Sequence, residues 1–306
     1  FGNEDIKELI EELNDEKMPE YKKYHESNDE IDEFQKNILD NSQNNIVRSA
    51  VISADRLISS LSAKHLESMI SDNTFDSFLN DKLGFESNLQ DHINTCISGF
   101  AKKYPDSDRN KKQDIASSDL ISDDISILSG AAGVGKTKIA LEWATKTYAK
   151  KIFWICPRVT VCQSIFNDLI QDDYLPNAKI ELNTGEFQIS SQGGVKFDTI
   201  EIFSGDIVIT TIDQFISSII THRDITKFVD LMCAHIVFDE FHEYINMSAF
   251  NLLFAELIQA KNNSNNTNTL LVSATPNYYF VEKFLNIDLD NIVCVESFNK
   301  SQYQLD

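Results

Sequence analysis

A glycine-rich segment at residues 130–137 gives the strongest indication of chemistry in the chain. Its sequence, GAAGVGKT, fits the pattern G-x-x-x-x-G-K-[ST], with an apolar run before it and a helix-forming run after it. Glycines let backbone N–H groups surround an anion, and the N-terminal end of the following helix adds positive potential. Lys136 would reach the β and γ phosphates, and the Thr137 hydroxyl would bind Mg²⁺. A glycine turn before an ordinary helix is the alternative. We predict a site for ATP with these cofactor-binding residues: Gly130, Gly133, Val134, Gly135, Lys136 and Thr137.

A pair of acidic residues could complete such a site. The run HIVFDEFH brings Asp239 and Glu240 to the end of an apolar, strand-like segment. In open α/β sheets ligands bind at the carboxyl ends of the strands. We assign Asp239 to Mg²⁺ and Glu240 to orienting and deprotonating the attacking water. His242 could link the nucleotide to a neighbouring element, and a surface or capping histidine is the alternative.

The elements that must position these residues follow from the hydrophobic pattern. From about Ile125, short β-rich runs alternate with longer helix-period runs, which predicts an α/β fold with a parallel sheet covered on both faces. The segment 179–205 is expected to be an irregular or hairpin insert, and the Asn-rich run 262–268 a surface loop. The expected strands are residues 125–128, 151–156, 206–211, 235–240 and 269–275, and the expected helices 136–150 and 247–261.

The first part of the chain has a different pattern. Apolar residues recur three and four apart in runs such as 46–70, and no convincing alternation of strand type occurs. We therefore expect an all-α domain or partial domain in residues 1–112, followed by the α/β domain in residues 113–306.

Composition limits the partners. The net charge of −21 argues against non-specific binding to duplex DNA, because phosphate contacts are made by Lys and Arg. Much of the acidic excess lies in residues 1–35, so it weighs less on the α/β part. No apolar run approaches the length of a membrane span, and the opening residues do not resemble a signal peptide. The sequence contains no CxxC pair, so a zinc site built from cysteines is not indicated. We expect a soluble, cytoplasmic protein without a membrane partner, and a chain that is an excised piece.

The ordered set of motifs resembles the DExH superfamily 2 helicases over about residues 109–276. In sequence order the motifs are GAAGVGKT, CPRVTVCQS, TTIDQF, DEFH and SATP. The resemblance implies a RecA-like lobe that hydrolyses ATP and tracks along single-stranded DNA, with RNA a less favoured partner. It implies backbone contacts to the strand from Pro157, Arg158, Thr160, Thr210, Thr211 and Gln214, and coupling of the ATP state to this grip by Ser273 and Thr275.

The same resemblance extends to two further features. Gln113 lies where the family's adenine-reading glutamine is often found, and an exposed linker glutamine is the alternative. A second RecA lobe of the parent chain would supply an arginine finger. We therefore expect this piece to bind ATP but to hydrolyse it poorly by itself.

A narrower resemblance concerns the run SAVISADRLISS, which is similar to the last helix of the HD nuclease domain in type I CRISPR-associated helicase–nucleases. It implies that Asp55 is a ligand of a divalent transition metal and that a CRISPR surveillance complex is a partner. The chain departs from this family because it contains no His-Asp dipeptide, and an exposed carboxylate on an amphipathic helix is the alternative for Asp55. The nuclease site would then be completed outside this chain.

Two other classes of function stay open at this point. One is a P-loop ATPase of another class, such as a signalling NTPase or a small-molecule kinase, in which TTIDQF and SATP have no role. The other is an ATP-binding module that serves as a platform for proteins. The presence of Lys136, Thr137, Asp239 and Glu240 argues against a degenerate site.

Overall fold

The computed structural model describes most of the chain from residue 61 onward. The described segments are residues 61–82, 88–105, 107–122, 125–198, 203–220, 234–246 and 268–298, with single positions or pairs between 36 and 59 and short stretches between 251 and 261.

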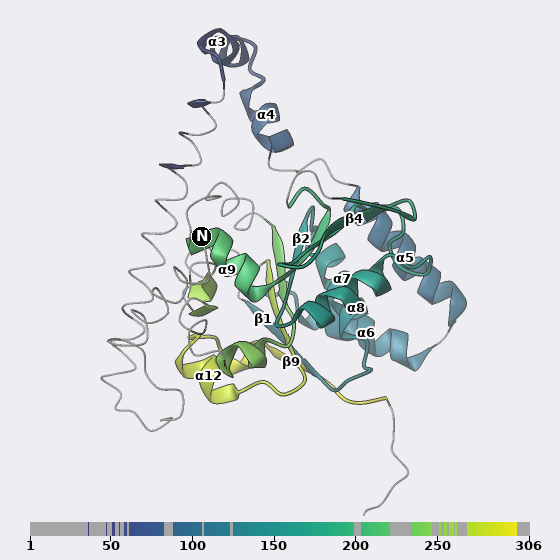
Figure 1. Ribbon diagram of the computed structural model, residues 1–306. Coiled ribbons are helices and arrows are strands. Elements are labelled where there is room, and N and C mark those ends of the chain that lie inside the picture. The colour runs from purple at the N-terminus through teal and green to yellow at the C-terminus, as the bar shows by residue number, and fades with distance from the viewer. Residues whose placement is uncertain are drawn as a thin grey trace, which may run out of the picture.

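The centre of the molecule is a nine-stranded, mostly parallel sheet, which confirms the predicted α/β class (Figure 1). Its strand order is β5-β4-β3-β6-β2-β7-β8-β1-β9. Only the pairs β3–β4 and β4–β5 are antiparallel among the described strands. The strands are β1 (Ser126–Gly130), β2 (Ile152–Cys156), β3 (Ile180–Asn183), β4 (Gln188–Gln192), β5 (Val195–Asp198), β6 (Ile207–Thr211), β7 (His235–Phe238), β8 (Thr269–Ser273) and β9 (Ile292–Val295).

The apolar sequences of the central strands follow from their burial on both faces. Every residue of β2, β6, β7 and β8 is buried. A parallel strand covered on both sides is apolar along its whole length and does not alternate. Figure 1 shows the helices on the two sides of the sheet. One core includes α9 and α12, and the other includes α5, α7 and α8.

The described helices include α7 in the run 136–150, where a helix was predicted, and the helices α8, α9 and α12, which were not predicted. In the first part of the chain they are α3 (Ala63–Ser71), α4 (Phe75–Lys82), α5 (Leu89–Lys103) and α6 (Asp108–Asp119). In the α/β part they are α7 (Lys136–Lys146), α8 (Val159–Leu169), α9 (Ile212–Ile220) and α12 (Tyr278–Lys283), with short 3₁₀ turns η1 (Phe241–Asn246) and η2 (Leu289–Asn291). No helix in these segments combines the length and the apolar character that crossing a bilayer requires.

One structural observation concerns the expected boundary between the helical part and the α/β part of the chain. The position between residues 112 and 113 lies inside α6, and α6 packs on α7 of the α/β part. The run 46–70 is interrupted before α3, whose N-cap is Ser62. The boundary between a helical domain and the α/β domain therefore stays a prediction.

The expected insert 179–205 contains a hairpin, as predicted, and its three described strands β3, β4 and β5 all belong to the nine-stranded sheet. β3 pairs in parallel with β6, and β4 and β5 are joined through Gly193 and Gly194, whose φ values are +60° and +77°. Strand β9 lies within the run NIVCV at 291–295, whose apolar, strand-like sequence is consistent with a strand. The predicted loop at 262–268 lies outside the described residues except for its last position.

Candidate nucleotide and strand-binding site

The order of the strands brings the predicted motifs to one edge of the sheet. Along the series β6-β2-β7-β8-β1, each strand is parallel to its neighbour. Their carboxyl ends therefore lie side by side. The motif segments TTIDQF, CPRVTVCQS, DEFH, SATP and GAAGVGKT begin at or next to these ends in that spatial order.

The phosphate loop has the geometry of an anion site. Gly133 and Gly135 have φ values of +82° and +85°, which only glycine adopts without cost. Gly135 is the N-cap of α7, and Lys136 and Thr137 open that helix with partly exposed side chains. The loop, the helix end, the ammonium group and the hydroxyl together fit the triphosphate of ATP and its Mg²⁺.

The Glu240 carboxylate connects three of the motifs. Its Oε1 lies 2.6 Å from Lys136 Nζ, and its Oε2 accepts a hydrogen bond of 3.2 Å from the Ala274 backbone N–H. The backbone of Glu240 has φ +46°, a left-handed conformation that costs a non-glycine residue of the order of 1–3 kcal/mol. The turn is held by Tyr244, whose hydroxyl is 3.0 Å from the Asp239 carbonyl oxygen and 2.9 Å from that of Ile155.

Asp239 lies beside Glu240 at the end of β7. Burial and the neighbouring Glu240 charge raise the pKa of Asp239 to about 6, although Lys136 opposes the change. Two effects disfavour the charged form of this carboxyl group: repulsion by the neighbouring carboxylate and the loss of hydration. A bound divalent cation compensates both effects, so this carboxylate is suited to bind one. Asp239 and Thr137 are therefore the residues that could hold Mg²⁺.

His242 joins the acidic turn to the SATP segment. Its Nδ1 lies 2.9 Å from Ser273 Oγ and 3.4 Å from Glu240 Oε2. Ser273 Oγ also accepts a hydrogen bond of 3.0 Å from the Thr275 backbone N–H. A continuous set of polar contacts thus runs from the phosphate loop through Glu240 and His242 to the end of β8.

Gln113 is buried on α6, with 1% of its surface exposed, so it is not an exposed linker residue. Its Nε2 donates to the Val134 carbonyl oxygen at 2.7 Å, and its Oε1 accepts from Lys138 Nζ at 3.0 Å. Both ends of the side-chain amide are therefore bonded to the protein beside the phosphate loop.

The predicted strand-binding residues differ in their exposure. Arg158 and Thr160 are exposed, whereas Pro157, Thr210 and Thr211 are buried, and Gln214 is partly buried. The hydroxyls of both threonines have no hydrogen-bond partner among the described residues. Contact between these hydroxyls and a strand would require the side chains that cover them to move.

Arg158 is held by an acidic residue of η1. Its Nη2 and Nε lie 2.7 Å and 2.8 Å from Glu243 Oε2. This contact joins the CPRVTVCQS segment to the turn that carries Glu240 and His242.

Asp55 is exposed, at one of the single described positions in the first part of the chain. No group of three His, Cys, Asp or Glu side chains that could hold a metal occurs within the described segments. Its role as a nuclease ligand stays a prediction.

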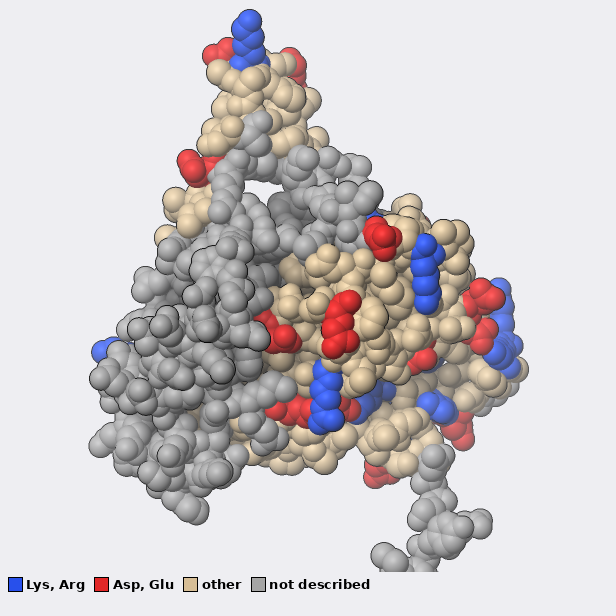
Figure 2. Space-filling model, viewed as in Figure 1, with Lys and Arg blue, Asp and Glu red and all other residues tan. Residues whose placement is uncertain are grey.

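The visible surface carries charges of both signs. Figure 2 shows basic and acidic side chains interspersed over the described part of this face, with no continuous basic area there.

The sequence motifs did not indicate three residues that contribute to the site. Arg109 donates to the Gly133 carbonyl oxygen at 2.7 Å, Lys138 contacts Gln113, and Glu243 contacts Arg158. Spacing in the sequence is the only signal that could have indicated these contacts. Arg109 lies one helical turn before Gln113, and Glu243 directly follows DEFH.

A parallel sheet with a phosphate loop after β1 and an acidic turn after β7 defines a RecA-like ATP-binding lobe. The family model of DEAD/DEAH box helicases matches residues 110–284, which is more than half of the chain, and the chain belongs to this family. It therefore contains a helicase-type ATPase domain. This match favours a helicase-type ATPase over a signalling NTPase or a small-molecule kinase.

Solved structures include similar helicases and ATPases. One of them is DUF1998 helicase MrfA bound to DNA, with 19% identity and a TM-score of 0.47. Another is the same protein bound to DNA and AMPPNP, with 18% identity and a TM-score of 0.47. A third is the Sulfolobus solfataricus SWI2/SNF2 ATPase core in complex with dsDNA, with 14% identity and a TM-score of 0.38. The matches cover 66%, 66% and 63% of this chain. They span 29%, 29% and 44% of those chains. No curated protein matches the chain.

Proposed function

We propose that this chain is the first RecA-like motor lobe of a DExH-type translocase that uses ATP to move along single-stranded DNA. The observation that supports this most directly is the strand order. β7, β8 and β1 carry the nucleotide residues, and β6 and β2, next along the sheet, carry the segments proposed to contact the strand. A strand bound at β6 and β2 would therefore lie beside the residues that sense ATP.

Each step of the proposed ATP hydrolysis is assigned to a residue of the site described above. Lys136 binds the β and γ phosphates, and Thr137 and Asp239 hold Mg²⁺, which neutralises charge on the phosphates when it is bound. Glu240 accepts the proton of the attacking water. For this role Glu240 must be released from Lys136, which lies 2.6 Å away.

Coupling to the strand would use the contacts around η1. His242 joins Glu240 to Ser273, and Glu243 joins the same turn to Arg158. A shift of this turn on ATP binding would therefore move groups at the ends of both β8 and β2. We propose Ser273, Thr275 and His242 as coupling residues on this basis.

Hydrolysis in this family involves a second RecA-like lobe, whose arginine finger contributes about 10³–10⁵ in rate in P-loop systems. We propose that residues 1–306 alone bind ATP and hydrolyse it slowly. Robust turnover by these residues at low concentration would contradict this part of the proposal.

Strand recognition is tested by fluorescence anisotropy with labelled single-stranded DNA, single-stranded RNA and duplex DNA at several salt concentrations. We expect the tightest binding to single-stranded DNA. Arg158→Ala should weaken binding and reduce the slope of log K against log salt by about 0.7, the value for one strand phosphate contact. Lys103→Ala, which removes a charge from α5, is the control and should change neither. Equal binding of duplex and single strand, or no effect of Arg158→Ala, would contradict the proposal.

We further propose that the motor belongs to a CRISPR-associated helicase–nuclease that acts with a surveillance complex. The run around Asp55 and the motif order support this. Cleavage of single-stranded DNA by the full-length protein with Mn²⁺ or Ni²⁺ should be lost in Asp55→Ala while ATP binding is kept. Metal-dependent cleavage that persists in Asp55→Ala, or no cleavage by the wild type, would contradict it.

A further inference from the structure

The helix α6 lies against the outer side of the phosphate loop and contacts two consecutive residues of it. Arg109 donates to the Gly133 carbonyl oxygen at 2.7 Å, and Gln113 donates to the Val134 carbonyl oxygen at 2.7 Å. Arg109 and Gln113 are four residues apart, so they lie on the same face of α6. One helix face therefore holds two neighbouring peptide groups of the loop.

Holding a carbonyl on one side fixes the direction of the next N–H. The peptide bonds of the described chain are trans, and a trans peptide is planar with its C=O and N–H pointing in opposite directions. With the Val134 carbonyl turned toward α6, the Gly135 N–H points away from α6, toward the inner side of the loop. Contacts on the outer side thus orient a donor on the side where phosphates would bind.

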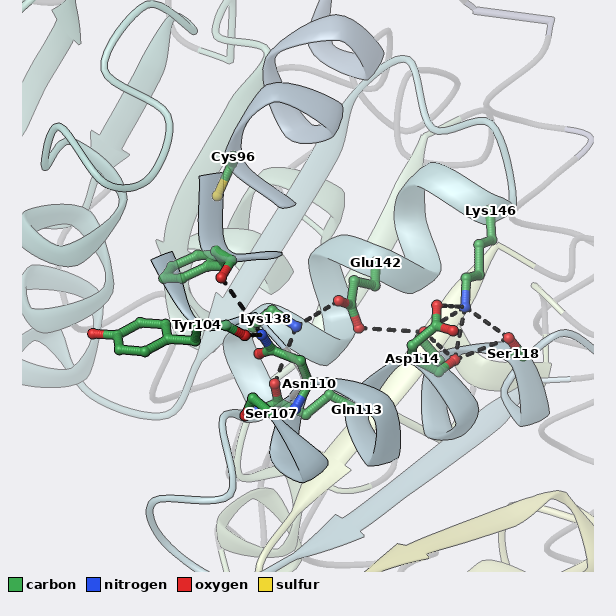
Figure 3. Close-up of polar contacts among 12 residues, drawn as sticks. Cys96, Tyr104, Ser107, Asn110, Gln113, Asp114, Ser118, Lys138, Glu142 and Lys146 are labelled. Atoms are coloured by element: carbon green, nitrogen blue, oxygen red, sulfur yellow. Dashed lines mark hydrogen bonds and ion pairs between the residues drawn. The ribbon is translucent and has the colours of Figure 1, made fainter. Parts of the chain in front are cut away.

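The orientation of the Gln113 amide is set by a buried ion pair. Lys138 Nζ lies 2.6 Å from Glu142 Oε1 and 3.0 Å from Gln113 Oε1. Figure 3 shows these three side chains and the contacts between them. An ammonium group can only donate, so the Gln113 atom facing Lys138 must be its oxygen. The amide nitrogen then faces the Val134 carbonyl, which can only accept. Gln113, Lys138 and Glu142 have 1%, 8% and 3% of their surfaces exposed, so water cannot easily replace these contacts.

The Gln113 side chain packs directly against the phosphate loop at Gly135. A Cβ atom at Gly135 would lie 2.3 Å from Gln113 Nε2, and the φ of Gly135 is +85°. The amide of Gln113 fills the space that a side chain at position 135 would take. The loop and α6 are therefore fitted to each other around this amide.

We propose that Gln113 is a positioning residue for the phosphate loop, oriented by the Lys138–Glu142 pair, and that it does not read the adenine base. This inference rests on the proposed nucleotide site. It predicts that Gln113 supports binding of the triphosphate whatever base is attached to it. A glutamine that reads adenine would instead contribute to ATP and not to ligands that lack adenine.

The test is isothermal titration calorimetry of the full chain with ATP, GTP and inorganic tripolyphosphate, each with Mg²⁺. Gln113→Ala should weaken all three by a similar factor of about ten, the effect of losing one such hydrogen bond. Gln113→Glu keeps an acceptor for Lys138 but cannot donate to Val134, and it should show the same loss. Asn110→Ala is the matched control, because Asn110 is on the same helix and its amide donates to the Phe100 and Tyr104 carbonyls.

A second variant separates orientation from stability. Removing Lys138 alone would leave Glu142 buried without a partner, which is strongly destabilising. The double variant Lys138→Met, Glu142→Met removes both charges together, a change that is often neutral or stabilising. We expect it to keep a wild-type thermal midpoint and to weaken tripolyphosphate binding.

The outcomes are distinct. Loss of ATP affinity alone in Gln113→Ala, with GTP and tripolyphosphate unchanged, would overturn the inference and favour a base-reading role. Unchanged tripolyphosphate binding in the double variant would overturn the role of the ion pair. Failure of the wild type to bind either ATP or tripolyphosphate would contradict the nucleotide site itself.

Discussion

Lys136 Nζ and Glu240 Oε1 lie 2.6 Å apart although 104 residues separate them in the sequence. Both side chains are mostly buried, with 15% and 24% of their surfaces exposed. The group proposed to bind phosphate is therefore paired with the group proposed to accept a proton from water. Phosphates that bind Lys136 would compete with this pair and release Glu240 for catalysis.

Glu240→Gln should separate ATP binding from hydrolysis. The amide cannot act as a base, so we expect the hydrolysis rate to fall by about 10²–10⁴. In this variant residue 240 no longer carries a negative charge that competes with phosphate for Lys136, so ATP affinity should be unchanged or higher. The rate is measured with full-length protein, and affinity by calorimetry. Glu282→Gln, on the exposed surface of α12, is the control. Hydrolysis at the wild-type rate in Glu240→Gln would show that another group is the base.

The raised pKa of Asp239 predicts a pH dependence of Mg²⁺ binding. Its value of about 6 means that the carboxyl is charged at pH 8 and mostly protonated at pH 5. A protonated carboxyl is a poor metal ligand, so the affinity for Mg²⁺·ATP should fall as the pH decreases through about 6. Calorimetry at pH 5, 6, 7 and 8 measures this. An affinity that is constant from pH 8 to pH 5 would contradict the assignment of Asp239 to the metal.

Asp239 also predicts how stability depends on pH in the absence of ATP and Mg²⁺. The folded pKa of about 6 lies above the ordinary value of about 4, so the folded state binds the proton more tightly. Asp239 therefore costs almost no stability below about pH 4, a growing amount between about pH 4 and about pH 6, and a constant amount above that. Asp239→Asn should raise the free energy of unfolding at pH 8 by roughly 1–3 kcal/mol and change it little at pH 4. Urea unfolding at both pH values checks this. Destabilisation of the variant at pH 8 would contradict the sign.

The contact of Arg158 with Glu243 predicts competition between Glu243 and DNA. Glu243→Gln removes a negative charge and loosens the guanidinium, so the affinity for single-stranded DNA should rise about threefold to tenfold. In the background of Arg158→Ala the same change should have a smaller effect, because the two residues share one contact. Anisotropy at fixed salt gives both values. Equal effects in the two backgrounds would mean that Glu243 acts only through overall charge.

The position of the nucleotide site could be predicted from the sequence because its residues lie in short segments directly after apolar strands. The spacing of Lys136 and Thr137 within one loop, and the placement of Asp239 after HIVF, define which sheet edge they share. The five strands of this edge were predicted for the same reason. The insert was recognised from its glycines, but not the parallel pairing of β3 with β6, since partner choice depends on contacts distant in sequence.

The detailed contacts could not be predicted in the same way. The amide of Gln113 is oriented by Lys138, 25 residues away, and no local pattern shows that α6 crosses the phosphate loop. Thr210 and Thr211 end a strand and carry hydroxyls, yet their exposure depends on which side chains cover them. The contact of Arg158 with Glu243 joins positions 85 residues apart. In each case the result depends on packing between elements.

The most direct test of the motor function is the ATPase rate of the full-length protein with and without single-stranded DNA, beside Lys136→Ala. We expect the strand to stimulate hydrolysis strongly and the variant to abolish both the basal and the stimulated rate, because the phosphates lose their charged partner. Hydrolysis that is independent of the strand, or no hydrolysis with ATP still bound, would contradict the motor function and favour an ATP-binding platform for other proteins.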